Sequence, residues 1–250
     1  MPPAGIAPSR WFEDVTASWG VTVAGPTAGL AWGDPNGDGR PDLWLGNHGE
    51  PAVLLLNDGT SLKDGSTWIG EGRGRYDDHG AAWADLDGDG DEDLVELVGA
   101  QGGKGAGSNR VWVNGGDVAE ERAATLGLDL PFERGRTPQW VDLDGDGLLD
   151  LVATASVRVD RTGGTAWMRQ EGGRFERMEG LPAANATLTV LVDVVGDERP
   201  EVVVGGPRFP EVVVGLRPPT IAPWVGPSAR AVRDVLVGDV DGPRFPEVVV

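Results

Sequence analysis

Three short acidic segments repeat one arrangement of oxygen-bearing side chains, and they are the residues of this chain best suited to chemistry. Each segment has Asp, or once Asn, at relative positions 1, 3, 5 and 9, and each has glycine at position 6. The segments are residues 34–42, 85–93 and 142–150. Carboxylates packed this closely repel one another by roughly 4 kcal/mol per pair at about 4 Å in an intermediate dielectric. Calcium relieves this repulsion, since it accepts about six to eight oxygen ligands, including a backbone carbonyl near position 7.

The second segment also fits an EF-hand, because Glu96 stands at position 12 counted from Asp85. In the other two segments position 12 is Leu45 and Ala153, neither of which ligates calcium. An EF-hand needs a flanking helix on each side, whereas residues 81–84 and 94–98 are short, apolar and typical of strands. We therefore expect the loops to connect the strands of β-hairpins, with Gly39, Gly90 and Gly147 allowing the bend.

The acidic loops mark a repeat of about fifty residues. The first aspartates of the loops are Asp34, Asp85 and Asp142, and two degenerate copies follow at Asp193 and Asp239, giving intervals of 51, 57, 51 and 46 residues. A period of this length with several short strands per repeat is typical of β-propeller blades. The sequence predicts an all-β fold, a propeller of four-stranded blades with about five repeats, partial or truncated, in one repeat array over residues 1–250.

Other residues also recur at fixed places within each repeat. Trp32, Trp83 and Trp140 each lie two residues before a loop, where an apolar residue packed between blades is expected. An apolar run follows each loop, at 43–45, 94–95, 151–152, 202–204 and 248–250, and a further strand is predicted at 53–57, 111–114 and 166–169. The outer strand is clearest at 174–178, and residues 11–16 resemble such a strand. The segment GPRFPEVVV stands at both 206–214 and 242–250.

With these residues in view, the chain resembles the FG-GAP and VCBS repeat proteins, which are related to the integrin α-chain head and to cartilage acidic protein. The resemblance implies calcium bound in hairpins on one side of a propeller. The implied side-chain ligands are Asp34, Asn36, Asp38 and Asp42; Asp85, Asp87, Asp89 and Asp93; and Asp142, Asp144, Asp146 and Asp150. The implied carbonyl ligands are those of Arg40, Asp91 and Leu148. About three well-formed sites follow, since the loops at Asp193 and Asp239 lack part of the pattern.

Composition limits the partners and the compartment. The net charge of −19 disfavours nucleic acid and anionic membrane surfaces, which bind basic patches. The sequence contains no run of eighteen or more apolar residues, so it predicts no membrane-spanning helix. Residues 1–10 lack the basic start and apolar core of a signal peptide. The chain has no cysteine, which excludes a disulfide scaffold and a thiolate site. Calcium modules of weak affinity operate outside cells, so we expect an extracellular or cell-surface location.

We expect this protein to act by binding a partner molecule. The main hypothesis is a calcium-stabilised adhesion module that presents propeller loops to a protein or glycan. The alternative is a glycan-binding lectin or a non-catalytic part of a polysaccharide-processing enzyme, suggested by ten tryptophans, of which Trp19, Trp68 and Trp224 lie outside the repeated positions. Catalysis is not expected, because His48 and His79 are the only histidines and no nucleophile, zinc-helix or nucleotide motif occurs.

Overall fold

The structure is a computed structural model of the 250-residue chain, and it describes residues 13–22, 25–70, 76–99, 107–178, 185–192, 201–205, 210–216, 219–223, 236–238 and 247–249. Within these residues the chain forms four antiparallel sheets of four strands each and one two-stranded sheet. The predicted all-β fold of four-stranded blades is confirmed.

The first three sheets each contain four consecutive strands in sequence order. The first sheet consists of β1 (Thr27–Gly33), β2 (Asp42–Asn47), β3 (Val53–Asn57) and β4 (Leu62–Asp64). The second consists of β5 (Asp78–Ala84), β6 (Asp93–Val98), β7 (Arg110–Val113) and β8 (Glu120–Glu121). The third consists of β9 (Arg134–Val141), β10 (Asp150–Ser156), β11 (Ala166–Glu171) and β12 (Arg174–Arg177).

The later repeats form one four-stranded sheet and one two-stranded sheet within the described residues. The fourth sheet consists of β13 (Leu188–Val192), β14 (Glu201–Gly205), β15 (Pro210–Leu216) and β16 (Pro219–Pro223), and the two-stranded sheet of β17 (Leu236–Gly238) and β18 (Glu247–Val249). The predicted apolar run at 202–204 therefore falls on β14, and residues 248 and 249 of the run predicted at 248–250 fall on β18, while residue 250 lies outside the described residues. The two copies of the duplicated segment take different places, since one supplies β15 and the other supplies β18. The first aspartates of the two degenerate loops, Asp193 and Asp239, lie outside the described residues.

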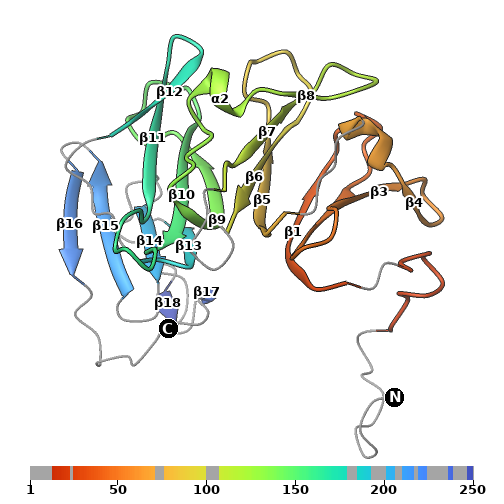
Figure 1. Cartoon of the computed structure of the whole chain (residues 1–250), viewed down its shortest axis with the longest axis horizontal. Helices are drawn as coiled ribbons and strands as arrows, with labels where there is room; N and C mark the ends of the chain where they lie inside the picture. The colour runs from red at the N-terminus through yellow and green to blue at the C-terminus, as the bar shows by residue number, and fades with distance from the viewer. Residues whose placement is uncertain are drawn as a thin grey trace, which may run out of the picture.

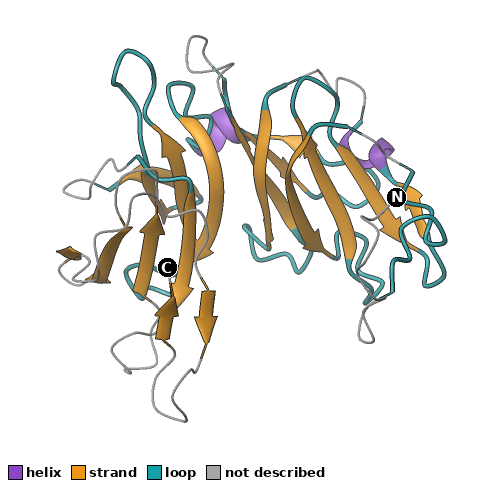
Figure 2. Cartoon of the chain, turned by 90° about the horizontal axis from the view of Figure 1, so that it is seen from below, coloured by secondary structure: helices purple, strands orange, loops and turns teal. Residues whose placement is uncertain are grey.

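Successive sheets stand beside one another as blades, with the first at one end of the row and the fourth at the other (Figure 1). Figure 2 shows the strands of neighbouring sheets running side by side. The only helices within the described residues are a 3-10 turn, η1 (Ser66–Ile69), and a single α-helical turn, α2 (Ala123–Leu126). No helix in the described part of the chain is long and apolar enough to cross a membrane.

The core lies between the blades and explains why the second strand of each blade is apolar on both faces. Along β6, Leu94 joins the cluster shared with the first sheet, whereas Val95 joins the cluster shared with the third. Side chains alternate between the two faces of a strand. A blade between two neighbours therefore buries both faces, and all six residues of β6 are buried.

Two of the three repeated tryptophans pack as predicted. Trp83 lies in the cluster between the first and second sheets, 5.5 Å from the ring of Trp68, and Trp140 lies 5.8 Å from the ring of Phe175. Trp32 differs, since it is 55% exposed on the face of β1 that points away from the second sheet. That face has no neighbouring blade among the described residues.

The segment before β1 does not form the outer strand that its sequence suggested. Residues 11 and 12 lie outside the described part, and residues 13–22 contain no strand. They form turns instead, in which the Trp19 amide donates to the Val15 carbonyl at 2.8 Å. The Leu62 amide donates to the Trp19 carbonyl at 2.8 Å, and Val21 packs on the outer face of the first sheet. The segment covers the blade without extending it.

Candidate metal centres

The three complete acidic loops are hairpin connections, as the sequence predicted. Each joins the first strand of a blade to the second: β1 to β2, β5 to β6 and β9 to β10. All three strand pairs have the same antiparallel polarity, so the loops emerge at the same end of their blades. The EF-hand alternative fails because strands, not helices, flank the second loop, and because Glu96 lies buried within β6 with an oxygen 2.9 Å from the Arg110 guanidinium.

The carboxylate at position 1 closes each loop on itself. In the first loop the Asp38 amide donates to Asp34 Oδ1 at 3.0 Å and the Gly39 amide donates to Asp34 Oδ2 at 2.8 Å. In the second loop Gly88 and Gly90 donate to the two oxygens of Asp85. In the third, Gly145 and Gly147 donate to the two oxygens of Asp142. The same backbone wrap is thus built three times from three sequences.

Positions 3 and 5 continue the wrap. In every loop the backbone amide of position 5 donates a hydrogen bond to the side-chain oxygen of position 3. The acceptors are Asn36, Asp87 and Asp144 in the first, second and third loops. The position-5 carboxylate accepts the position-7 amide, which belongs to Arg40, Asp91 and Leu148. Each of these side chains is therefore turned inward over its own loop, with further lone pairs left on its oxygens.

Glycine at positions 4 and 6 makes this backbone path accessible. At position 6, Gly39, Gly90 and Gly147 have φ values of +80°, +98° and +90°. A Cβ added at any of the three would meet no atom within 4 Å. The glycines are therefore required by the left-handed conformation and not by close packing, as the sequence predicted for position 6.

The carboxylate at position 9 has a different role, because it is buried at the start of the second strand. Asp93 is 1% exposed, and its oxygens accept the Asn114 amide at 2.7 Å and the Leu86 amide at 2.9 Å. Asp150 makes the matching pair with the amides of Gln170 and Leu143. Position 9 therefore ties the loop to the end of the third strand in the same blade.

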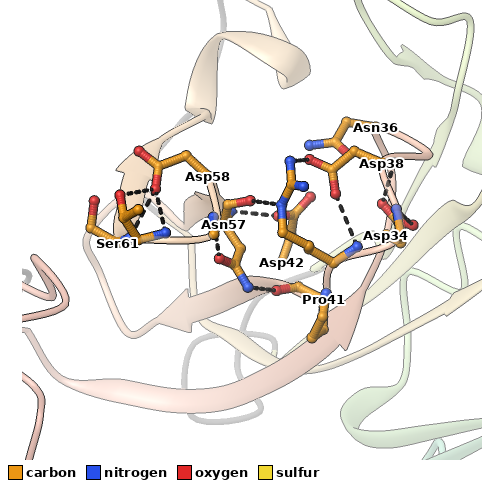
Figure 3. Close-up of polar contacts among 12 residues, drawn as sticks. Asp34, Asn36, Asp38, Pro41, Asp42, Asn57, Asp58 and Ser61 are labelled. Atoms are coloured by element: carbon orange, nitrogen blue, oxygen red, sulfur yellow. Dashed lines mark hydrogen bonds and ion pairs between the residues drawn. The ribbon is translucent and has the colours of Figure 1, made fainter.

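The first loop lacks one of these bonds. Asp42 Oδ1 accepts the Asn57 amide at 2.6 Å (Figure 3), but Asp42 Oδ2 is buried with no hydrogen-bond partner. The cause is Pro35 at position 2, which has no N–H to donate where the other loops have Leu86 and Leu143. A buried carboxylate oxygen without a partner is costly, and a cation in the loop would satisfy it.

Burial changes the protonation of the position-9 carboxyls. Desolvation raises the pKa of Asp42 and of Asp93 to about 6, and it also raises the pKa of Asp150. The neighbouring loop carboxylates add to the effect, Asp38 and Asp34 in the first loop and Asp87 and Asp89 in the second. These loops carry more negative charge than their hydrogen bonds compensate.

The donor set fits a hard cation. Carboxylate oxygens of Asp85, Asp87 and Asp93 lie within 4.8 Å of one another, and so do those of Asp142, Asp144 and Asp146. Oxygen donors with several carboxylates match calcium and not a soft transition metal. In the first loop one cation is already present, because Arg40 Nη2 lies 2.5 Å from Asp38 Oδ2 and Arg40 Nε donates to the Asn57 carbonyl. Calcium would have to compete with this arginine for Asp38.

Contacts between blades hold the loops in place, and the sequence did not reveal them. The Asn114 side chain donates to the Pro35 carbonyl of the preceding blade at 2.7 Å, and the Gln170 side chain donates to the Leu86 carbonyl at 3.1 Å. Each is an amide side chain at the end of a third strand, before a glycine turn. This shared place in the repeat is the signal that could have identified them.

Comparisons with known proteins agree with this geometry. Residues 34–96, which contain the first two loops, match the family model described as an FG-GAP-like repeat. The resemblance inferred from the sequence is confirmed over this stretch. A search of curated proteins gave no significant match.

Solved structures show a related fold. A lectin of Agrocybe aegerita that recognises non-reducing terminal N-acetylglucosamine superposes with a TM-score of 0.52 at 19% identity, over 87% of this chain and 58% of the lectin. The biofilm matrix protein Bap1 of V. cholerae matches with a TM-score of 0.48 at 18% identity, over 92% of this chain and 36% of Bap1. The chain thus spans less than two thirds of either protein. At these identities the likeness to the lectin establishes the fold alone.

Proposed function

We propose that this chain is a calcium-stabilised binding module of an extracellular or cell-surface protein, and that its propeller loops contact a protein or a glycan. The observation that carries the proposal is the recurrence of one inward-turned, oxygen-lined hairpin loop at the same end of three consecutive blades. Calcium at these loops would neutralise the carboxylates and fix the hairpins. A surface fixed in advance binds a partner with a smaller loss of conformational entropy.

The proposed ligands follow from the geometry of the loops. Positions 1, 3, 5 and 9 would supply side-chain oxygens in each loop, and position 7 would supply a carbonyl. The unpaired Asp42 Oδ2 supports position 9 as a ligand in the first loop. The grouping of Asp93 with Asp85 and Asp87 supports it in the second.

The partner is most readily sought among glycans and extracellular proteins. Sites of this kind commonly hold calcium with dissociation constants of about 10⁻⁴ to 10⁻³ M, which matches calcium outside cells. The net charge of −19 supports partners other than nucleic acid or anionic lipid. We further propose that the module acts by binding and not by catalysis, since its dense carboxylate pairs are engaged by backbone amides.

A glycan-binding function is the second candidate, and exposed aromatic rings favour it. Trp19 and Trp32 are 37% and 55% exposed, whereas Trp68 is buried in the core and Trp224 lies outside the described residues. Exposed tryptophan faces offer apolar platforms for sugar rings. The lectin that shares this fold recognises N-acetylglucosamine, which makes that sugar the first ligand to test.

Binding to arrays of glycans and of extracellular matrix proteins, each in calcium and in a chelator, tests the proposal. We expect calcium-dependent retention of the wild-type chain, and weaker retention when Asp85 and Asp142 are both replaced by Asn. The matched control is Asp91→Asn, because this exposed carboxyl shares the second loop while only its backbone is a proposed ligand. Binding that is equal in calcium and chelator would refute the role of the loops. Loss of glycan binding in Trp19→Ala or Trp32→Ala, with calcium binding intact, would favour the lectin.

A further inference from the structure

The two histidines of the chain meet at the interface between the first and second blades, at the end opposite to the acidic loops. His48 follows β2, and His79 is the second residue of β5. The Nε2 atoms of the two rings lie 3.2 Å apart. Asp77 joins them, with its Oδ1 atom 3.4 Å from His48 Nε2 and 3.6 Å from His79 Nε2. We refer to His48, Asp77 and His79 as the histidine cluster.

We propose that the histidine cluster is a second metal site, distinct from the acidic loops, which takes a divalent transition metal of the zinc class and joins the first blade to the second. Two imidazole nitrogens and one carboxylate oxygen form a donor set that suits zinc and not calcium.

The distances support coordination of one ion. A tetrahedral zinc site with bonds of about 2.0 to 2.1 Å places its ligand atoms about 3.3 to 3.4 Å apart. The three separations in the cluster span 3.2 to 3.6 Å. One ion can therefore contact all three atoms with little movement of the side chains. The His48 side chain is 46% exposed, which leaves a fourth position open to solvent.

The backbone holds the cluster on both sides of the interface. His48 and Asp77 form an isolated antiparallel bridge between the blades. The Gly49 amide donates to the Tyr76 carbonyl at 2.6 Å, and the Gly99 amide donates to the Asp77 carbonyl at 2.7 Å. These bonds fix the places from which the three side chains project.

Glycine also gives the cluster its space. A Cβ at Gly99 would lie 2.4 Å from His79 Nε2 and 2.6 Å from Asp77 Oδ2. A side chain at this position would displace both donors. Among the described residues, the ion-pair partners of Asp77 are the two imidazoles, and no Arg or Lys side chain takes its oxygens. The nearby Arg136 guanidinium donates instead to the carbonyls of Arg134 and Gly135.

The test is titration of tag-free protein with zinc chloride by isothermal calorimetry at neutral pH, in excess calcium so that the acidic loops are occupied. Tag-free protein is essential because the chain has only two histidines. We expect one zinc ion per chain, and cobalt substitution should give the intense visible absorption of a tetrahedral site. His48→Gln should weaken zinc binding by at least about tenfold, which is the scale on which altered coordination shells act.

Two controls make the result decisive. Because His48 is half exposed, His48→Gln should melt at the wild-type temperature in chelator, so its loss of zinc would not reflect unfolding. Asp146→Asn in the third acidic loop should leave zinc affinity unchanged. Zinc binding that is absent, that survives His48→Gln, or that disappears in Asp146→Asn would overturn the proposal.

Discussion

The two ends of the first and second blades use different chemistry on the same strands. At one end lie the loop between β1 and β2 and the loop between β5 and β6. Each of these loops brings together carboxylates of its own hairpin. At the other end, the histidine cluster takes one residue from the first blade and two from the second. A cation at the loop end would stabilise a blade, whereas a cation at the histidine end would join two blades.

The two ends also differ in the burial and pairing of their charged side chains. The residues at positions 1, 3 and 5 of the three loops, which are all aspartates except Asn36, are exposed or half-buried, where a dissolved cation can reach them. Near the histidine cluster, Asp78 and Glu96 are buried together on Arg110, which lies 2.5 Å from Asp78 and 2.9 Å from Glu96. Burial, with a contribution from Arg136, lowers the pKa of His79 to about 4 and so keeps its imidazole neutral. The described residues of the second and third acidic loops thus place carboxylates together without a paired guanidinium, whereas Asp78 and Glu96 at the histidine end share the Arg110 guanidinium.

The largest expected effect concerns glycines at the two ends of the first hairpin. A Cβ at Gly29 in β1 would lie 1.9 Å from the carbonyl oxygen of His79 in β5. Gly29→Ala should destabilise the chain by at least about 3 kcal/mol, because neither backbone can give way cheaply. Gly37→Ala at the loop end, with φ +66° and open space around it, should cost only about 1 kcal/mol. Urea unfolding of both variants measures the difference, and equal losses would contradict the packing described for β1.

The buried carboxyl of the second loop should matter nearly as much. Asp93→Ala leaves the amides of Asn114 and Leu86 without acceptors, so we expect a loss of about 3 kcal/mol in calcium-free buffer. Asp91→Asn, which alters an exposed carboxyl two residues earlier, should change stability by less than about 0.5 kcal/mol. Thermal melts of the two variants in chelator make the comparison. If Asp93→Ala left the melting temperature unchanged, position 9 would not tie the loop to the third strand.

The buried pair near the histidine end predicts a pH dependence. Desolvation and the charge of Glu96 raise the pKa of Asp78 from 3.8 to about 8. The folded chain therefore holds an additional proton between about pH 4 and pH 8, and stability from this group falls as the pH rises through that window. The slope should approach about 1.4 kcal/mol per pH unit, the value for one proton. Asp78→Asn should flatten the slope in denaturant unfolding at pH 5 and pH 7, and an unchanged slope would assign the effect to other groups.

The smallest effect distinguishes the loops from one another. Position 3 is Asn36 in the first loop and aspartate in the other two. Asn36→Asp adds one negative charge, so the calcium affinity of the first loop should rise by a few-fold. Calcium calorimetry on this variant should show one tightened site beside two unchanged ones. No change in any site would mean that position 3 of the first loop does not contact the ion.

The two ends also differ in how far the sequence predicts them. The acidic loops and the strand at 53–57 follow from spacing alone, because each hairpin is closed by its own residues, and the strand predicted at 174–178 is observed at Arg174–Arg177. Spacing also predicted the packing of Trp83 and Trp140, but not the exposure of Trp32, which depends on the absence of a described blade beside β1. The histidine cluster did not follow from spacing, since His48 and His79 are brought together by the packing of two blades. The unpaired oxygen of Asp42 lies between these cases, because it follows from Pro35 only after the bond from Leu86 to Asp93 is known.

The most direct test of the central claim is a calcium titration of chelator-stripped protein by isothermal calorimetry, with a thermal melt at each end of the titration. We predict three sites per chain and a clear rise in melting temperature, since each site stabilises by about 1.4 kcal/mol for each tenfold excess of calcium over its dissociation constant. Replacing both Asp85 and Asp142 with Asn should leave one site. An absence of binding heat together with an unchanged melting temperature would contradict the account, because the acidic loops would then be turns that hold no metal.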